Sequence, residues 1–199
     1  MLLSLLLVFL AYLVGAIPTG VVFCKLLFNK IITEHGSGNI GASNVGRVLG
    51  KRYFFPVFII DALKAYLVLF FALWIYPEQP IFLTYLLAAT VLLGNGFSLF
   101  IKFKGGKGVA TTFGIIGFLC PWYILICFAT SWVLIALLIK KPFIASLATC
   151  SATILLLCAL GQYDHVLFLS GVLAWLTYRH LPNFGGWCKK CCPCPWRKI

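Results

Sequence analysis

The chain has 199 residues, of which 62% are hydrophobic and 10% are charged, and it carries a formal net charge of +12. Soluble globular domains are about half apolar and about one quarter charged, so this composition excludes a soluble domain. Several apolar runs reach the ~20 residues that a helix needs to cross a bilayer. The sequence lacks the short segments of alternating polarity that are typical of an outer-membrane barrel. It therefore predicts an all-α polytopic membrane protein.

The positive charge has a different meaning in a membrane protein than in a soluble one. In a soluble protein it would point to nucleic acid, whereas in a membrane protein it indicates cytoplasmic segments rich in Lys and Arg. Applied along the chain, that rule predicts seven transmembrane helices, with the N-terminus outside and the C-terminus in the cytoplasm. The predicted spans are residues 1–28 (with a kink near Pro18), 53–76, 81–101, 109–120, 122–139, 143–160 and 166–178.

The first predicted cytoplasmic segment, residues 29–52, is centred on HGSGNIGASNVGR and has little apolar periodicity. Its G-x-G-x-x-G spacing matches a dinucleotide fingerprint. That motif needs a preceding strand in a soluble βαβ unit, so we reject this reading. Two alternatives stay open, a flexible polar loop and a site for an anion and a polyol. Such a site would use the side chains of Ser37, Asn39, Ser43, Asn44 and Arg47.

Two charged residues lie inside the second predicted span. Asp61 and Lys64 are three residues apart, so they share one face of a helix. Charges within a span are costly and usually line a functional interior. The alternative is a self-neutralising pair near the cytoplasmic interface, with the Lys64 side chain reaching toward water.

The second predicted cytoplasmic loop contains FKGGKGVAT, residues 103–111. Its glycines let backbone N–H groups approach an anion closely, and Lys104 and Lys107 add positive charge. The spacing is not that of a Walker A loop. The segment is either a phosphate loop at the membrane surface or a basic loop that only sets topology. Asn95, near the end of the preceding span, is either a site residue or a hydrogen-bonding contact between helices.

The C-terminal half adds polar groups near the same predicted face. Ser146 can bind phosphate or bond the carbonyl four residues before it. His180 and Asn183 lie at the membrane edge. Reduced thiols are favoured over a zinc site for the cysteines at 188, 191, 192 and 194. The predicted domains are a seven-helix membrane domain, residues 1–183, and a basic cytoplasmic tail, residues 184–199, with no metal.

Four motifs in chain order resemble the bacterial membrane-integral acyl-phosphate:glycerol-3-phosphate acyltransferase family of the PlsY type. They are SGNIGASN with Arg47, DALK, FKGGKGVAT and HLPN. The resemblance implies a seven-helix fold and transfer of a fatty acyl group from acyl phosphate to the 1-hydroxyl of glycerol 3-phosphate. Lysophosphatidate and phosphate would be the products, in the first acylation step of phospholipid biosynthesis.

The resemblance also implies a place for the protein in the cell. It implies a multi-pass protein of the bacterial cytoplasmic (inner) membrane, with the site on the cytoplasmic face, in contact with membrane lipid and coupled to acyl-phosphate synthesis. Neither acyl-CoA, a metal nor another cofactor is implied. We expect a monomer and no nucleic-acid partner.

Carried over residue by residue, the resemblance implies two sets of groups. The catalytic set is Ser37, Arg47, Lys107, His180 and Asn183. The substrate-binding set is Asn39, Ser43, Asn44, Asp61, Lys64, Lys104, Gly105, Gly106, Gly108, Thr111 and Ser146. The chain departs from the family pattern where Asn95 replaces a histidine, Ala65 a glycine and Gly186 an arginine.

A membrane transporter or flippase for an organic phosphate is the alternative function. It would also need intramembrane charge and anion-binding loops. Transport sites usually lie at the membrane midplane, whereas these polar clusters are predicted at one face, which favours the acyltransferase. No Ser-His-Asp arrangement is evident, so we expect the glycerol hydroxyl to attack the donor directly.

Overall fold

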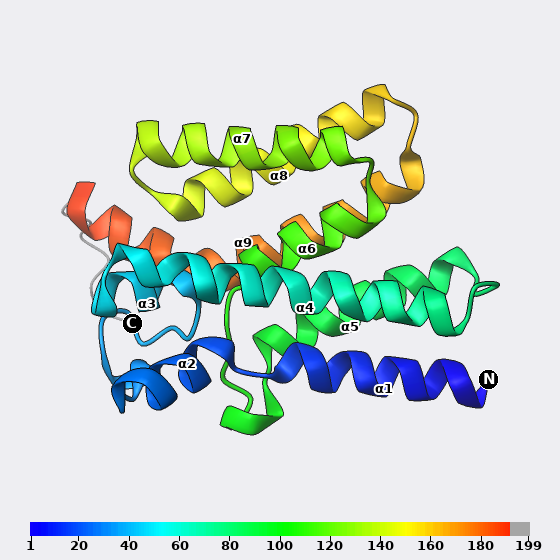
Figure 1. Cartoon of the computed structure of the whole chain (residues 1–199). Coiled ribbons are helices and arrows are strands. Elements are labelled where there is room, and N and C mark those ends of the chain that lie inside the picture. The colour runs from blue at the N-terminus through cyan, green and yellow to red at the C-terminus, as the bar shows by residue number, and fades with distance from the viewer. Residues whose placement is uncertain (192–199) are drawn as a thin grey trace, which may run out of the picture. The chain divides into compact units, whose positions relative to one another are not determined.

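The structure is a computed structural model that describes the backbone of residues 1–191 and the side chains of residues 1–184. Its described part is helical and contains no strand, which confirms the all-α prediction (Figure 1). The α-helices are α1 (Leu2–Ala16), α2 (Thr19–Phe28), α3 (Ala42–Leu49), α4 (Phe54–Ile75), α5 (Ile81–Gly96), α6 (Val109–Leu119), α7 (Trp122–Ile139), α8 (Pro142–Ala159) and α9 (Tyr163–Cys191). Three 3-10 turns join them, η1 (Ile32–Glu34), η2 (Lys51–Tyr53) and η3 (Leu99–Ile101). The prediction of reduced thiols rather than zinc at the cysteines of positions 188, 191, 192 and 194 concerns side chains that lie outside the described residues.

The predicted spans coincide with helices, but fewer than seven pass a test of length and apolarity. In the described residues four helical segments are long and apolar enough to cross a membrane, Lys51–Ile75, Ile81–Ile101, Trp122–Ile139 and Pro142–Ala159. The bent pair Leu2–Ala16 and Thr19–Phe28 makes a fifth if it counts as one span. Helix α6 has only 11 residues, about 17 Å of helix against a hydrocarbon core of ~30 Å.

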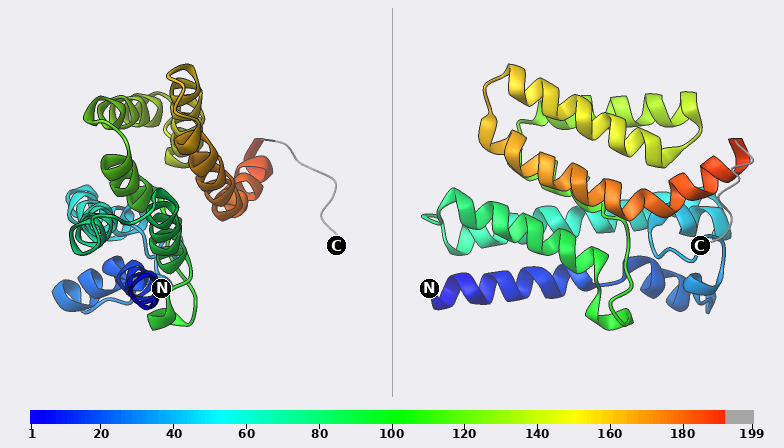
Figure 2. Two further views of the ribbon diagram at one scale, coloured as in Figure 1. Left: turned by 90° about the vertical axis from the view of Figure 1, so that its right-hand side faces the viewer. Right: turned by 180° about the vertical axis from the view of Figure 1, so that it is seen from behind.

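The chain divides into two compact units, Met1–Leu125 and Ile126–Ile199. In the first unit α1 packs along α5 and α4 along α6 (Figures 1 and 2). A Cβ at Gly15 or Gly94 would overlap the facing backbone of α5 or α1, and one at Gly114 would overlap the Ala62 carbonyl. Small residues thus bring these helix axes close together, as is common in membrane proteins. In the second unit α8 packs against α9.

The predicted kink near Pro18 is confirmed as a break between α1 and α2, which are bent by 43°. Proline lacks an N–H group and its ring clashes with the preceding helical turn. Thr19 to Phe28 therefore forms a separate helix whose start lies beside α4.

The segment 29–52 is not a structureless loop, so the flexible-loop alternative is wrong. It contains η1, the eight-residue helix α3 and η2. Its few apolar side chains form a buried cluster with α2 and α4 that includes Cys24, Ile32, Ile40, Val45 and Val57. The helix was missed because it has only eight residues and lies between Gly41 and Gly50, although its apolar side chains share one face.

Candidate functional site

Asn44 is the centre of the SGNIGASN segment. It is 1% exposed, and its Oδ1 atom accepts a hydrogen bond from the Ser37 backbone N–H at 2.8 Å. Its Nδ2 atom donates to the carbonyl oxygens of His35 at 2.9 Å and Asn39 at 2.8 Å. A Cβ at Gly36, where φ is +64°, would overlap the Asn44 side chain. Asn44 therefore holds the segment in one conformation from the inside.

The side chains that face outward in this segment are Ser37, Ser43 and Arg47, which are all exposed. Ser43 and Arg47 are four residues apart on α3, so they lie on one face of the helix. Arg47 also donates to Asn44 Oδ1 at 3.3 Å. Asn39 is half-buried and accepts from the Gly41 N–H at 2.8 Å. Two hydroxyls and a guanidinium are thus presented on a rigid base, a set suited to phosphate and hydroxyl groups.

The glycine loop, residues 104–108, is pressed against the C-terminal end of α5. The Gly106 N–H donates to the Asn95 carbonyl at 2.9 Å. A Cβ at Gly105 would overlap the backbone of Asn95 and Gly96. Only glycine fits at position 105 without lifting the loop off α5, and a Cβ at Gly106 would displace the Asn95 side chain or the loop.

Two lysines flank this close contact. Lys104 is exposed and Lys107 is half-buried. Gly108 follows with φ at +89°, and α6 begins directly after it. The first N–H groups of an α-helix lack intrahelical acceptors, so this loop and helix start can bind an anion.

Two neighbouring threonines on α6 differ in their bonding. The Thr112 hydroxyl bonds the Gly108 carbonyl at 2.9 Å. Thr111 is fully buried, and its hydroxyl has no hydrogen-bond partner within the described part of the chain. A buried hydroxyl of this kind costs free energy unless a water or ligand satisfies it.

Asp61 and Lys64 form a buried ion pair, with Lys64 Nζ 2.7 Å from Asp61 Oδ1. The same carboxylate oxygen accepts from the Thr19 hydroxyl at 2.7 Å. Lys64 Nζ also donates to the Ile17 carbonyl at 3.0 Å. Lys64 is 9% exposed, so its side chain turns into the helix packing and does not reach toward water. Both charged side chains therefore bond to residues at the break between α1 and α2, Asp61 to Thr19 and Lys64 to Ile17.

The second unit holds Ser146, His180 and Asn183. Ser146 Oγ donates to the Pro142 carbonyl at 2.9 Å, the bond to the fourth preceding carbonyl that was one of its two alternatives. It also accepts from Trp132 Nε1 at 3.0 Å. His180 is 4% exposed, and its Nδ1 atom lies 3.0 Å from Asn183 Nδ2. An amide N–H donor at Nδ1 leaves the proton of a neutral imidazole on Nε2.

A family model described as glycerol-3-phosphate acyltransferase matches residues 5–190. The chain belongs to the glycerol-3-phosphate acyltransferase family. Glycerol-3-phosphate acyltransferase of Staphylococcus saprophyticus is 37% identical over 182 residues, which cover 87% of this chain and 89% of that protein. Its namesake from Aquifex aeolicus is 38% identical over 181 residues, covering 90% and 93%. The resemblance read from the motifs is therefore confirmed.

Solved structures of the family share the fold of this acyltransferase family member. A crystal structure of PlsY (YgiH), an integral membrane glycerol 3-phosphate acyltransferase, in its glycerol 3-phosphate form superposes with a TM-score of 0.85 at 31% identity. The match covers 94% of this chain and 92% of that one. The lysophosphatidic acid form of PlsY gives a TM-score of 0.83. The similarity to PlsY supports the prediction that this chain is an integral membrane protein.

Three residues that contact the candidate groups could not be predicted from the sequence. Ser98 is fully buried below the glycine loop, Thr19 bonds Asp61, and Trp132 bonds Ser146. Each is an ordinary helix or loop residue whose partner lies far away in the sequence. Among the described residues, no group of three His, Cys, Asp or Glu side chains is placed to hold a metal ion.

Proposed function

We propose that this protein transfers a fatty acyl group from acyl phosphate to the 1-hydroxyl of glycerol 3-phosphate, forming lysophosphatidate and phosphate. Family membership supports the acceptor and the reaction. PlsY, which shares the fold, has forms with glycerol 3-phosphate and lysophosphatidic acid. The observation that supports acyl phosphate as the acyl donor is the glycine loop, whose backbone is held on α5 between Lys104 and Lys107.

The glycine loop is the proposed site of the acyl phosphate. The N–H groups of this loop other than that of Gly106, which donates to Asn95, bind its phosphate together with the Lys107 side chain. The Thr111 hydroxyl lies in the first turn of α6 behind them. Backbone donors are fixed in place, so they stabilise the growing charge on the phosphate without reorganising. The acyl chain of the donor lies among lipid-facing apolar side chains.

Glycerol 3-phosphate is the proposed ligand of Arg47 and Lys104. The Arg47 guanidinium binds phosphate oxygens through two parallel hydrogen bonds, and Lys104 adds a point charge. Ser37, Asn39 and Ser43 lie beside Arg47 and bind the glycerol hydroxyls. Ser146, His180 and Asn183 of the second unit are proposed as site residues on the family resemblance, with His180 donating from Nε2.

The proposed reaction needs no covalent enzyme intermediate. The glycerol O1 atom attacks the acyl carbon, a C–O ester bond forms, and the bond from the acyl carbon to the phosphate oxygen breaks. Inorganic phosphate leaves with the bonding electron pair and takes the hydroxyl proton, directly or through the phosphate of glycerol 3-phosphate. The protein aligns two anions and neutralises their charge.

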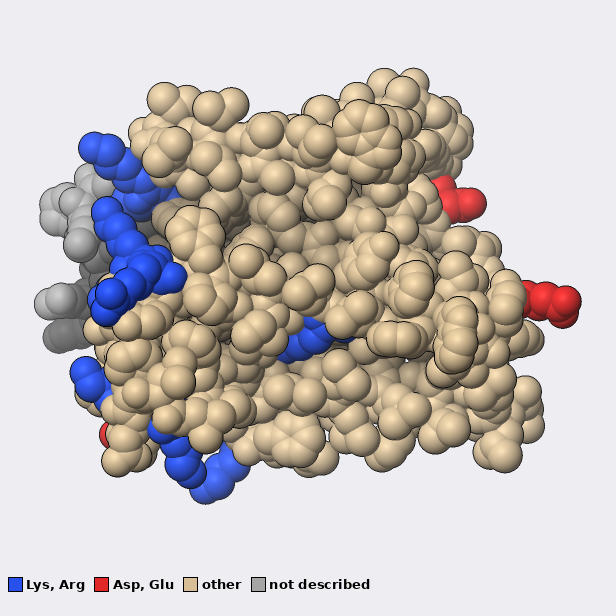
Figure 3. Space-filling model, in the orientation of Figure 1, with Lys and Arg blue, Asp and Glu red and all other residues tan. Residues whose placement is uncertain are grey.

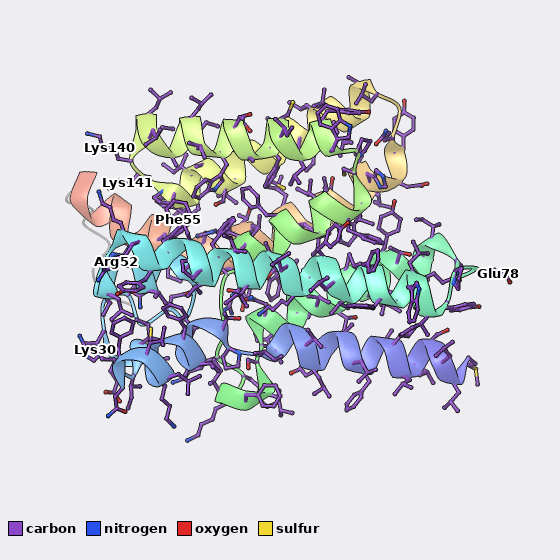
Figure 4. The ribbon with its side chains drawn as sticks, in the orientation of Figure 1. Lys30, Arg52, Phe55, Glu78, Lys140 and Lys141 are labelled. Atoms are coloured by element: carbon purple, nitrogen blue, oxygen red, sulfur yellow. The ribbon has the colours of Figure 1, made fainter. Side chains whose placement is uncertain are left out.

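We also propose the predicted topology: seven spans, the N-terminus outside, and the site on the cytoplasmic face of the bacterial inner membrane. Basic side chains, Lys30 and Arg52 among them, gather at one end of the first unit, and Glu78 lies at the other (Figures 3 and 4). The asymmetry fits the excess of Lys and Arg in cytoplasmic loops. In this topology α6 is a short span and residues 1–183 carry the activity as a monomer, coupled to a reaction that makes acyl phosphate.

Phosphate release from the purified protein in lipid tests the function. The substrates are palmitoyl phosphate and glycerol 3-phosphate, with EDTA present. We expect release that depends on glycerol 3-phosphate, is lost in Lys107→Ala and is kept in Lys25→Ala, which removes an exposed lysine of α2. No release from folded protein, with uptake of glycerol 3-phosphate into vesicles, would replace this proposal by the transporter.

A further inference from the structure

The break between α1 and α2 leaves backbone carbonyls that accept hydrogen bonds from side chains of α4 and of the loop after α5. In an uninterrupted helix the carbonyls of Ala16 and Ile17 would accept N–H groups four residues on. Here the Ser98 hydroxyl donates to Ala16, and Lys64 Nζ donates to Ile17 at 3.0 Å. The Thr19 hydroxyl is bound in turn by Asp61. Ser98, Thr19, Asp61 and Lys64 are all buried.

One side of this break supports the SGNIGASN segment. Gly20, at the start of α2, faces Ile40, which lies in the middle of that segment. A Cβ at Gly20 would overlap the Ile40 carbonyl, and it would stand 3.2 Å from Val45 Cγ2 on α3. The position of α2 therefore sets the position of the backbone that presents Ser37 and Arg47.

The other side of the break supports the glycine loop. Ser98 closes the η3 turn that precedes this loop. Its carbonyl accepts from Phe103 N at 2.8 Å, and its N–H donates at 3.3 Å to the carbonyl of Lys104, the first residue of the loop. The Ser98 hydroxyl bonds the Ala16 carbonyl and so holds this turn, and with it the start of the glycine loop, at the break. Figures 1 and 2 show the green segment with η3 beside the junction of α1 and α2, which agrees with the contact between α1 and η3.

We propose that residues 16–20 are a positioning element that sets both substrate loops at once. Asp61 and Lys64 hold this element in place and do not contact substrate, in contrast to the role that the resemblance implies for them. The inference rests on the proposed function, because it takes one loop for acyl phosphate and the other for glycerol 3-phosphate. It predicts that a change at Ser98 affects acyl phosphate more than glycerol 3-phosphate, whereas a change at Thr19 affects both.

Ser98→Ala and Thr19→Val test the two hydrogen bonds separately. Losing one hydrogen bond changes an equilibrium by about fivefold. We expect Ser98→Ala to raise the KM for palmitoyl phosphate by about fivefold. The KM for glycerol 3-phosphate should rise less, because only one of the two proposed phosphate ligands of that substrate, Lys104, is bonded to Ser98. Thr19→Val should raise both KM values, since Thr19 holds the whole break, and Thr19→Ser should restore them.

Matched controls remove the same groups elsewhere. Ser170→Ala and Thr90→Val delete hydroxyls that bond only the fourth preceding carbonyl of their own helix. Their KM values should equal those of the wild type. All variants are compared by gel filtration and melting temperature, so that only folded proteins enter the comparison.

The ion pair is tested by comparing Lys64→Met with the double variant Asp61→Leu/Lys64→Met. Removing one partner leaves a buried unpaired charge, whereas removing both does not. If the pair only holds the break, the double variant has a higher kcat/KM than Lys64→Met. If Lys64 binds substrate, the double variant is as impaired as the single one, and the assignment of the pair is overturned.

The outcomes separate this inference from the proposed function. An inactive wild type overturns the proposed function. An active wild type whose Ser98→Ala and Thr19→Val variants behave like Ser170→Ala and Thr90→Val overturns the positioning element alone. A Ser98→Ala protein with a raised KM only for glycerol 3-phosphate overturns it as well.

Discussion

The backbone N–H of Gly106 donates a hydrogen bond to the carbonyl oxygen of Asn95 at 2.9 Å. The Asn95 side-chain oxygen lies 2.6 Å from the place that a Cβ of Gly106 would occupy. Asn95 is buried, and its backbone and side chain both lie against the glycine loop. It forms the base on which the glycine loop rests.

Gly106→Ala should therefore displace the loop. An added Cβ meets the Asn95 side chain, so the N–H groups of the loop move off the donor phosphate. A misplacement of about 1 Å can cost roughly 100-fold in rate, and we expect kcat/KM for palmitoyl phosphate to fall by about that factor. Gly171→Ala is the matched control, since a Cβ at Gly171 meets nothing within 4 Å. Equal kinetics of the two variants would contradict the role of the loop.

Asn95→Asp tests the electrostatics below the same loop. The change keeps the shape of the side chain but places a negative charge next to Gly106. We expect the KM for palmitoyl phosphate to rise by about tenfold, because a like charge destabilises the bound phosphate. Asn95→Ala removes the amide without adding charge and should have a smaller effect. An Asn95→Asp protein with unchanged KM would place the donor phosphate elsewhere.

Arg47→Ala should weaken glycerol 3-phosphate binding. Charge-assisted hydrogen bonds contribute about 1.5–3 kcal/mol each, so we expect kcat/KM to fall by roughly 10–100-fold. Arg47→Lys should recover part of the loss, because lysine keeps the charge but not the planar fork. Arg52→Ala is the control, since Arg52 stacks over Tyr53 at 4.7 Å. Near-normal turnover of Arg47→Ala would remove Arg47 from the site.

Asn44→Asp should destabilise the fold around the first loop. The carboxylate cannot donate to the carbonyls of His35 and Asn39, which lie 2.9 and 2.8 Å from the present Nδ2 atom. We expect a loss of about 2–3 kcal/mol and a melting temperature lower by roughly 5–10 °C. Asn29→Asp is the control, because Asn29 is exposed in a left-handed conformation that aspartate tolerates. Equal melting temperatures would show that Asn44 does not organise the segment.

Trp132→Phe should affect the acceptor site through Ser146. The change removes the indole donor 3.0 Å from Ser146 Oγ and keeps an aromatic ring on α7. Because one hydrogen bond is lost, we expect the KM for glycerol 3-phosphate to rise by about fivefold. Trp122→Phe, at a position 73% exposed, serves as the control. If Trp132→Phe and Trp122→Phe give the same KM, the hydrogen bond from Trp132 to Ser146 does not contribute to the binding of glycerol 3-phosphate.

The helices and the family were readable from local patterns. Apolar runs between basic or proline-containing turns predicted the ends of α4, α7 and α8 to within one residue, because span length and turn residues are local properties. The glycines of FKGGKGVAT were interpreted as allowing close approach to an anion, whereas the structure shows that Gly105 is also required for contact with the end of α5. Helix α3 was missed because eight residues give a short pattern, and the apolar face of the helix is stabilised by packing against α2 and α4.

The sequence by itself determined the all-helical membrane fold, the break at Pro18 and the residue types of the two substrate loops. Only the tertiary structure decided which partners the buried polar groups have. Thr19 and Asp61 are 42 residues apart, Lys64 and Ile17 are 47 apart, and Ser98 and Ala16 are 82 apart. A buried polar group needs a partner, but its choice depends on which distant segments the helix packing brings together. The same packing turns Asn44 and Asn95 inward, as supports for the loops above them.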